Sequence, residues 1–242
     1  MDTTTAILIS KYGAPEVLEE REIPLPAPSP DEIHIRVEAT GVNFADLLQR
    51  VGLYGTVPPL PYAPGFEVAG TVARVGKEVS GWTVGDRAVA ILRHGGYARD
   101  VVIPAEQAFP YPDSLTPAEA AGTPVVFLTA WVCLFETGHA RPGDTVLVLG
   151  AGGGVGTAAV QLAVHRGLRV FGTAGSPEKR TYVVEELGAE ACFDSRGEWA
   201  DALFGALGGK RGLDIAWGPG GGRAAVACRG LGDRWGRVGG CG

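Results

Sequence analysis

A glycine-rich turn between an apolar strand and a helix constrains the fold of this chain more than any other feature. Residues 146–149 are aliphatic, residues 150–156 read GAGGGVG, and small and aliphatic residues follow at helical spacing up to residue 165. At such a turn, bare backbone can approach a pyrophosphate, and the start of the helix offers free N–H groups and the positive end of its dipole. The sequence therefore predicts a nucleotide site, with a tight structural turn that binds nothing as the alternative.

The spacing of the glycines indicates which backbone groups contact the nucleotide. The strict GxGxxG pattern is absent because Ala151 stands in place of the first glycine, and a GxxGxxG pattern remains. We expect contacts to the cofactor from Gly150, Gly153, Gly154, Val155 and Gly156.

The end of the next expected strand selects between NADH and NADPH. An NADH site usually places Asp or Glu about 20 residues further on, where the carboxylate binds the ribose 2′-hydroxyl. Here no acidic residue precedes Glu178 in that region. Ser176 and Lys179 could donate to a 2′-phosphate and Arg180 could add positive charge. The alternative is that Ser176 only caps a helix and both cations are solvated. We expect NADPH as the cofactor.

The periodicity changes near residue 120, which indicates two domains. Before it, short strand-like segments at 34–39, 67–72 and 86–91 are separated by Gly and Pro turns, as in a small barrel-like β domain. After it, apolar segments alternate with helical ones, as in a parallel sheet with right-handed crossovers. A capping box with proline at the first helical position begins at Thr116. We place the domains at residues 1–122 and 123–242. The second domain is expected to contain strands at 145–149, 169–173, 191–193 and 213–217 and helices at 154–165 and 177–187.

Composition excludes several classes of protein. A hydrophobic content of 45% and a charged content of 20% are typical of a globular chain. The net charge of -6, without a basic block, argues against a nucleic-acid partner. No apolar stretch approaches the roughly 20 residues of a membrane helix, and no secretory signal begins the chain. The four cysteines are far apart and form no CxxC pair, so we expect reduced thiols, no disulfide framework and a cytoplasmic protein.

Five short motifs accompany the glycine turn: residues 39–46 (ATGVNFAD), 52–54 (GLY), 64–70 (PGFEVAG), 85–87 (GDR) and 128–131 (LTAW). Together, over residues 6 to about 217, they resemble the medium-chain dehydrogenase/reductase superfamily, specifically its quinone oxidoreductase (zeta-crystallin-like) branch. The resemblance implies an α/β protein with a GroES-like β-barrel domain, then a Rossmann domain, and a substrate cleft between them. It also implies a small quinone or enone substrate, and dimers through the edge of the Rossmann sheet. Thr129 is implied as a cofactor contact, whereas Trp131 is expected in the core.

The resemblance also bears on metal binding. Zinc-dependent relatives carry a cysteine where Asn43 stands, a histidine where Phe66 stands, and a lobe with four closely spaced cysteines that is not found here. Zinc needs about three protein ligands and an open position, so we expect no metal site. The four histidines, which show no ligand spacing, are interpreted as surface or loop residues: His34, His94, His139 and His165.

Without a metal, side chains near the nicotinamide must polarise the substrate carbonyl. The resemblance places Asn43, Asp46 and Tyr54 there. Asn43 could donate its amide N–H to the carbonyl oxygen, and Tyr54 could donate a hydrogen bond or a proton. Each has a structural alternative: Asn43 ties down a loop, Asp46 caps a helix beginning near Leu47, and Tyr54 packs in the cleft.

The end of the chain departs from the family pattern. Ten of the 25 residues at 218–242 are glycine, so this segment buries little apolar area against its backbone entropy. By resemblance, residues 236–240 are a fifth Rossmann strand, and family members continue beyond it. We therefore expect an incomplete Rossmann domain, with an out-of-frame reading of a G/C-rich message as one hypothesis. Three functions stay open: an NADPH-dependent quinone or enone reductase, an enoyl-thioester reductase, and a truncated NADPH-binding protein without activity.

Overall fold

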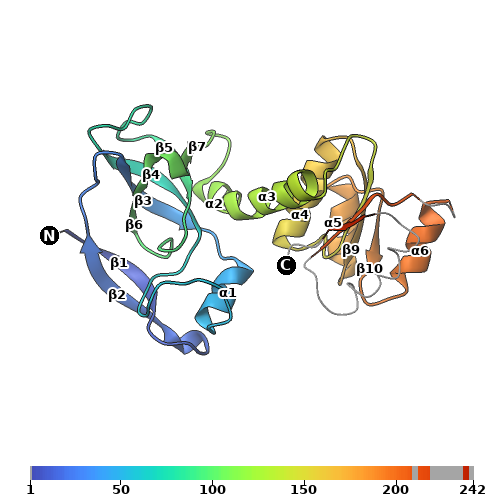
Figure 1. Cartoon of the computed structure of the whole chain (residues 1–242), viewed down its shortest axis with the longest axis horizontal. Helices are drawn as coiled ribbons and strands as arrows, with labels where there is room; N and C mark the ends of the chain where they lie inside the picture. Colours follow the sequence, from blue (N-terminus) through green and yellow to red (C-terminus); the bar gives the residue numbers. More distant parts are fainter. Residues whose placement is uncertain (1, 209–211, 219–236, 240–242) are drawn as a thin grey trace. The chain divides into compact units, whose positions relative to one another are not determined.

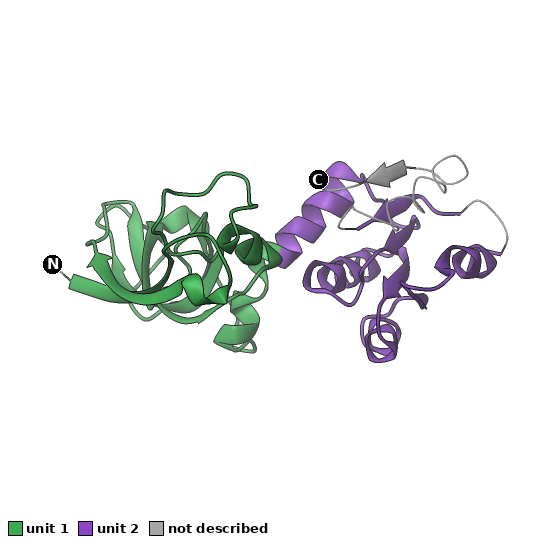
Figure 2. Cartoon of the chain, turned by 90° about the horizontal axis from the view of Figure 1, so that it is seen from below, with its two compact units in different colours: residues 1–125 green, residues 126–242 purple. Residues whose placement is uncertain are grey.

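The chain forms two compact units, Met1–Val125 (unit 1) and Val126–Gly242 (unit 2), which are coloured separately in Figure 2. The computed structural model describes residues 2–208, 212–218 and 237–239. The division between the units falls three residues after the expected domain boundary at 122/123.

Unit 1 is built on two antiparallel β-sheets (Figure 1). In the smaller sheet β1 (Asp2–Ile9) pairs with β2 (Leu18–Leu25). The larger sheet has the order β6-β3-β4-β5-β7. Its strands are β3 (Glu32–Thr40), β4 (Glu67–Val75), β5 (Arg87–Ile91), β6 (Asp100–Pro104) and β7 (Ala108–Pro110).

The larger sheet confirms the three strands predicted for this region, which correspond to β3, β4 and β5. Ile33 and Ile35 of β3 pack with Val68 and Val72 of β4 in one buried cluster. Gly70 of β4 lies opposite Val37, beside a bulge in β3. A Cβ on Gly70 would be 2.9 Å from the carbonyl carbon of Arg36, so the contact leaves no room for a side chain. The glycine thus permits the close approach of the two central strands.

His34 differs from its interpretation as a surface or loop residue, which is wrong. It lies on β3 with only 5% of its surface exposed. Its Nε2 is 2.8 Å from Oδ1 of Asp100 on β6, and Thr4 on β1 donates to Oδ2 of Asp100 at 2.9 Å. The carboxylate across the sheet lets the imidazole be buried. His94, His139 and His165 are exposed, as expected.

Two short helices complete unit 1, together with 3-10 turns at Pro15–Val17 and Ala105–Gln107. α1 spans Phe44–Arg50, so it begins three residues before the predicted start near Leu47. α2 spans Pro117–Ala121 and has the predicted capping box at Thr116. The Oε2 atom of Glu119 accepts from the backbone N–H of Thr116 at 2.8 Å, and Thr116 Oγ1 accepts from Glu119 N at 3.3 Å.

Unit 2 contains a parallel sheet in the order β10-β9-β8-β11-β12. Its strands are β8 (Thr145–Val148), β9 (Arg169–Ala174), β10 (Ala191–Asp194), β11 (Ile215–Trp217) and β12 (Arg237–Gly239). All pairings are parallel. The predicted strands are therefore confirmed, although β11 begins two residues later than expected. The fifth strand is confirmed for residues 237–239, and residues 236 and 240 lie outside the described part of the chain.

Helices alternate with these strands (Figures 1 and 2). They are α3 (Pro124–Trp131), which continues into a π-helical turn at Val132–Thr137, α4 (Gly154–His165), α5 (Pro177–Glu185) and α6 (Trp199–Ala206). α4 has the predicted bounds and α5 ends two residues early. Within the described residues no helix combines the length and apolarity needed to cross a bilayer.

Two expectations about unit 2 are wrong. Trp131 is half-exposed rather than in the core, with its ring 4.7 Å from the guanidinium of Arg166 and its Nε1 donating to Glu136 at 3.2 Å. Cys133 is disulfide-bonded, whereas Cys192 is a free thiol, so the expectation of reduced thiols fails for Cys133. Sequence separation does not reveal such a bond, because it depends on where the fold places each Cβ.

Candidate functional site

The glycine turn after β8 is fastened to the neighbouring strand β9. Gly150 has φ of +67°, a left-handed conformation that favours glycine. Its N–H donates to Thr173 Oγ1 at 3.2 Å, and the N–H of Ala151 donates to the carbonyl oxygen of Thr173 at 2.8 Å. Thr173 is itself buried. The turn is therefore held in place before any ligand binds.

The start of α4 lies against this turn so closely that only glycine fits. A Cβ on Gly156 would lie 2.8 Å from Ala151 Cα and would overlap the carbonyl oxygen of Gly150. On the outer side, Gly153 and Gly154 are exposed. Gly153 caps α4 without a side-chain hydrogen bond, so the amides of the first turn, at residues 154–156, lack helical partners. This bare backbone fits the diphosphate of a dinucleotide, and it contains all five predicted contact residues.

Ser176 and Lys179 lie at the end of β9, beside the turn. Ser176 caps α5, and its Oγ accepts from the backbone N–H of Lys179 at 3.4 Å. The aliphatic stem of Lys179 crosses the glycine turn, because a Cβ on Gly152 would be 2.9 Å from Lys179 Cβ. Both the capping role of Ser176 and the proximity of Lys179 to the turn are thus present.

Arg180 is already engaged within unit 2. Its Nη1 atom lies 3.1 Å from Oδ2 of Asp194, the last residue of β10, and donates to the carbonyl oxygen of Ala174 at 3.4 Å. Its guanidinium is 24% exposed. The ion pair with Asp194 offsets the charge that Arg180 would offer a phosphate.

Asn43 and Asp46 lie together at the start of α1. Asn43 precedes the helix, and Oδ2 of Asp46 accepts from its backbone N–H at 2.8 Å. The same oxygen accepts from the hydroxyl of Tyr97 at 3.0 Å. Asp46 is 4% exposed. The predicted alternative for Asp46, a helix cap, is therefore present at this site, in the first turn of α1.

Glu67 holds the side chain of Asn43. Its Oε1 atom accepts from Asn43 Nδ2 at 2.8 Å, and its Oε2 atom accepts from the backbone N–H of Val125 at 2.8 Å. Glu67 is 2% exposed, and its side chain fills the space beside Gly41, where a Cβ would lie 2.6 Å from Glu67 Cδ. One N–H of the Asn43 amide is thereby used within the protein.

Burial shifts the acidity of this cluster. It raises the pKa of Asp46 above its ordinary value, against the hydrogen bonds from Asn43 and Tyr97, which lower it. It also raises the pKa of Glu67, against the hydrogen bonds from Val125 and Asn43. Burial is the largest cause of a raised pKa at Tyr97, where the Asp46 carboxylate adds to the effect. The cluster favours protonated acids because little water reaches them.

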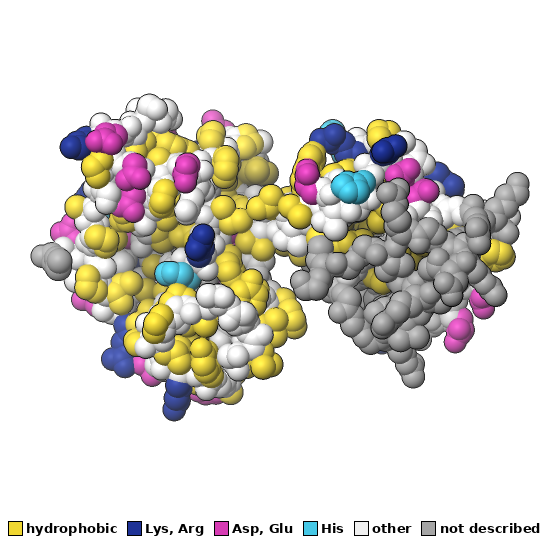
Figure 3. Space-filling model, viewed as in Figure 1, with side chains coloured by type: hydrophobic (Ala, Val, Ile, Leu, Met, Phe, Trp, Pro, Cys, Tyr) yellow, Lys and Arg dark blue, Asp and Glu magenta, His cyan; other side chains and the backbone are white. Residues whose placement is uncertain are grey.

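Tyr54 lies in the loop after α1, on the exposed side. Its ring is 37% exposed and tilts against Phe66 with centroids 5.6 Å apart. Val42, Phe44 and Leu53 nearby are each more than 70% exposed. Figure 3 shows hydrophobic side chains gathered over this part of unit 1. Tyr54 is thus a partly exposed phenol accompanied by exposed apolar side chains.

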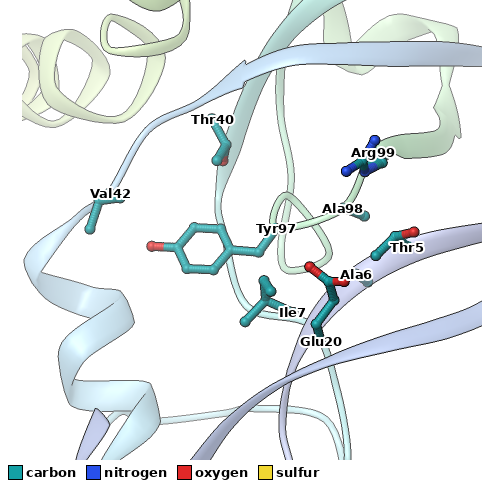
Figure 4. A pocket seen from close by; sticks show the side chains of 9 residues that line it. All are labelled: Thr5, Ala6, Ile7, Glu20, Thr40, Val42, Tyr97, Ala98 and Arg99. Atoms are coloured by element: carbon teal, nitrogen blue, oxygen red, sulfur yellow. The ribbon is translucent and has the colours of Figure 1, made fainter. Parts of the chain in front are cut away.

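A cavity of about 300 Å³ lies on another side of Tyr97 (Figure 4). Ile7 and Val42 contribute apolar walls, and Glu20 and Arg99 also line it. The Tyr97 ring lines the cavity, while its hydroxyl reaches Asp46. Tyr97 thus separates this cavity from the carboxylate.

The structure brings the predicted residues together in two groups. Asn43, Asp46 and Tyr54 belong to unit 1, and the glycine turn with Ser176, Lys179 and Arg180 belongs to unit 2. Thr129 is half-buried on α3 of unit 2. No three His, Cys, Asp or Glu side chains in the described ranges are grouped to hold a metal ion.

Sequence reasoning assigned no role to Tyr97 or Glu67. Glu67 stands within the quoted motif PGFEVAG, but an acidic residue at a strand start gives no local sign of its partner. Tyr97 follows a Gly-Gly pair. That pair could have indicated a close backbone approach, since the N–H of Gly96 donates to the carbonyl oxygen of Gly65 at 3.0 Å.

The chain is similar to known proteins over most of its length. Residues 29–113 match the family model described as "Alcohol dehydrogenase GroES-like domain", and residues 154–242 match "Zinc-binding dehydrogenase". The synaptic vesicle membrane protein VAT-1 homolog of Rattus norvegicus is 46% identical over 160 residues, 66% of this chain and 40% of that protein. The quinone oxidoreductase of Mus musculus is 36% identical over 213 residues, 87% of this chain and 64% of that protein.

Similarity to a solved structure agrees with this relationship. The CurK enoyl reductase superposes with a TM-score of 0.86 at 31% identity, over 93% of this chain and 70% of that one. The predicted GroES-like and Rossmann domains are confirmed. The chain spans about 64% of the mouse quinone oxidoreductase and 40% of the rat VAT-1 homolog. It belongs to the medium-chain dehydrogenase/reductase superfamily, in the quinone oxidoreductase branch.

Proposed function

We propose that this chain binds NADPH in unit 2 and serves the zinc-independent reduction of a quinone or another conjugated carbonyl. The observation that carries the proposal is the glycine turn, whose bare backbone lies beside a strand end with no acidic side chain before Glu178. A carboxylate at that strand end would favour NADH by binding the ribose 2′-hydroxyl. Here Ser176 and Lys179 occupy the region instead.

The residues proposed to hold the cofactor divide by the group that they contact. The amides at 154–156 would hold the diphosphate, because they are the positive end of the α4 dipole and have no helical partner. The N–H groups of Gly150 and Gly153 are used within unit 2, so these two residues would contribute by letting the diphosphate approach the bare backbone. Ser176 and Lys179 would hold the 2′-phosphate through hydrogen bonds, that of Lys179 being charge-assisted. Arg180, which is paired with Asp194, would support this site from beside the phosphate. Thr129 is a further proposed contact. Bound NADPH supplies a hydride.

The chemistry left to the protein is to orient the carbonyl compound and stabilise negative charge on its oxygen. Tyr54 is proposed to donate its phenolic proton or a hydrogen bond there, and its exposed ring among apolar side chains supports this role. Asn43 is proposed to donate its second amide N–H, since the first is held by Glu67. Asp46 is proposed to support Asn43 through the helix start.

A related activity, the reduction of an enoyl thioester, is a second candidate. The similarity to an enoyl reductase over 93% of this chain supports it. Both reactions need an apolar site and a hydrogen-bond donor near the carbonyl oxygen, so the same residues would serve. The substrates differ chiefly in size and in the group attached to the carbonyl.

The test combines binding with turnover on the purified chain. NADPH is titrated by calorimetry, and its oxidation is then followed with a benzoquinone and, separately, with a crotonyl thioester. We expect saturable binding and faster oxidation with the quinone. Faster oxidation with the thioester would favour the second activity, and binding without oxidation would favour a non-catalytic NADPH-binding protein. Absence of binding would refute the proposal.

Location and assembly are part of the proposal. We infer a cytoplasmic protein that acts on a small molecule and forms homodimers through the edge of the sheet in unit 2. Cell fractionation tests the first inference. Sedimentation of the purified chain tests the second, and a monomer at all concentrations would contradict it.

A further inference from the structure

Three cationic side chains approach the ends of β9 and β10, but they differ in what they already bind. Arg180 pairs with Asp194 at 3.1 Å. Lys179 lies along the glycine turn through its contact with Gly152. Arg196, which follows β10, makes no side-chain hydrogen bond or ion pair within the described part of the chain. Arg196 was not among the predicted cofactor contacts.

The guanidinium of Arg196 lies beside Gly175, the residue before the helix cap Ser176. A Cβ on Gly175 would be 3.3 Å from Arg196 Nη2 and 3.7 Å from Nε. The hydroxyl of Ser195 would be 3.6 Å from the same point. A guanidinium and a hydroxyl therefore lie beside the backbone of Gly175, between the end of β9 and the start of α5.

The loop that carries Arg196 is fixed by several hydrogen bonds. Asp194 Oδ1 accepts from the backbone N–H of Arg196 at 2.9 Å, and the carbonyl oxygen of Asp194 accepts from Gly197 N at 3.1 Å. The N–H of Ser195 donates to the carbonyl oxygen of Ala174 at 3.2 Å. Since Arg180 holds the other oxygen of Asp194, Arg180 also helps to position this loop.

We propose that Arg196, assisted by Ser195, binds the 2′-phosphate of NADPH and determines the preference for NADPH over NADH, while Arg180 positions the loop through Asp194. The inference rests on the proposed binding of NADPH in unit 2. A guanidinium can donate two parallel hydrogen bonds to a phosphate, whereas the 2′-hydroxyl of NADH offers no charge to match.

The balance of charge around this position supports the assignment. Arg180 and Asp194 offset each other, which leaves Lys179 and Arg196 with Glu178 as the neighbouring acid. Hydrogen bonds from its own backbone N–H and from Ser176 lower the pKa of Glu178, which favours its charged form. A dianionic phosphate would meet a net positive site only if Arg196 contributes.

The experiment distinguishes the affinity for the 2′-phosphate from the affinity for the rest of the cofactor. The full chain and its variants are titrated by calorimetry with NADPH, NADH, adenosine 2′,5′-bisphosphate and 5′-AMP. Arg196→Ala is expected to lower the affinity for NADPH and for the bisphosphate about tenfold to a hundredfold, as for the loss of a charged hydrogen bond. The affinities for NADH and 5′-AMP should change less than about twofold. The affinity of Arg196→Lys for NADPH should lie between those of the parent chain and Arg196→Ala.

Two further variants control for net charge and for position. Arg141 is an exposed arginine before β8, at the amino-terminal ends of the parallel strands, whereas Arg196 follows a carboxyl end. Arg141→Ala should therefore leave all four affinities unchanged. Arg180→Ala should lower the affinity for NADPH less than Arg196→Ala does, because the guanidinium of Arg180 is already paired with Asp194. Melting curves confirm that each variant is folded.

The outcomes distinguish this inference from the proposed function. Equal weakening of NADH and NADPH by Arg196→Ala, or no weakening, would overturn the role of Arg196 and leave the proposed function standing. A larger effect of Arg180→Ala than of Arg196→Ala would also overturn the assignment. If the parent chain binds none of the four nucleotides, the proposed function fails and this inference fails with it.

Discussion

Replacing Gly156 with alanine tests whether the glycine turn is as rigid as its contacts indicate. The added Cβ would lie 2.8 Å from Ala151 Cα and would overlap the Gly150 carbonyl oxygen. Both neighbours are backbone atoms, and the turn is tied to Thr173 by two hydrogen bonds, so neither can rotate away. The clash must be relieved by moving the turn or the first turn of α4.

The expected cost follows from two opposing effects. Overpacking a tight contact costs about 3 kcal/mol at the upper end of its usual range. Alanine favours a helix over glycine by about 1 kcal/mol. The free energy of unfolding of unit 2 should therefore fall by about 2 kcal/mol, or about 5–10 °C in melting temperature. Affinity for NADPH should fall as well, because the displaced amides belong to the proposed diphosphate site.

Gly205→Ala is the matched control, in the same unit and also within a helix. Gly205 lies on α6, is exposed, and has no atom within 4 Å of a Cβ. Only the helix propensity changes there, so unit 2 should gain about 0.5–1 kcal/mol and keep its affinity for NADPH. Both variants are measured by scanning calorimetry. If Gly156→Ala melts at or above the temperature of the parent chain and binds NADPH equally well, the reasoning from the close contact is refuted.

Three further variants test separate parts of the molecule. Burial raises the folded pKa of Glu67 and Asp46 above their ordinary values of 4.5 and 3.8. The folded state thus keeps protons that the unfolded chain has released, so stability falls as pH rises from about 4 through the raised folded values. Urea unfolding against pH should show a flatter fall for Glu67→Gln, and an unchanged slope would contradict this account. Tyr54→Phe should lower kcat with a quinone about a hundredfold while KM for NADPH stays constant, and a rate equal to that of the parent would exclude a proton donor at this position. Ser176→Ala should cost about 0.5–1 kcal/mol through the lost cap and weaken NADPH more than NADH. An unchanged melt and an unchanged affinity ratio would argue against both roles of Ser176.

Features encoded by neighbouring residues could be predicted from the sequence. The bounds of α4 match the prediction because the glycines before it and the small residues within it are contiguous. The capping box at Thr116 is likewise local. By contrast, β1 and β2 were missed, since β2 reads LEEREIPL and carries successive charged residues without a clear alternation. Its strand conformation comes from pairing with β1 along its whole length.

Contacts between distant segments could not be predicted in this way. Tyr97 and Asp46 are 51 residues apart, and Glu67 and Asn43 are 24 apart. Arg196 reaches Gly175 only because parallel strands bring the ends of β9 and β10 to one edge of the sheet. Resemblance to the family identified Asp46 and Asn43. Their partners, Tyr97 and Glu67, come from the loop before β6 and from the start of β4, which only the fold brings to α1.

The contacts at α1 indicate which predicted residues of unit 1 could meet a substrate directly and which could act only through a neighbour. Asp46 is buried, and the oxygen that it uses is shared between the backbone of Asn43 and the hydroxyl of Tyr97. Because its carboxylate is shielded from solvent, Asp46 does not meet a substrate directly, and its influence on any reaction passes through Asn43. Glu67 fixes the amide of the same residue. Asn43 is therefore held at its backbone by Asp46 and at its side chain by Glu67. Of the three predicted residues, Tyr54 is the one whose ring is more than a third exposed, and in the proposed reaction it is the group free to meet a carbonyl oxygen directly.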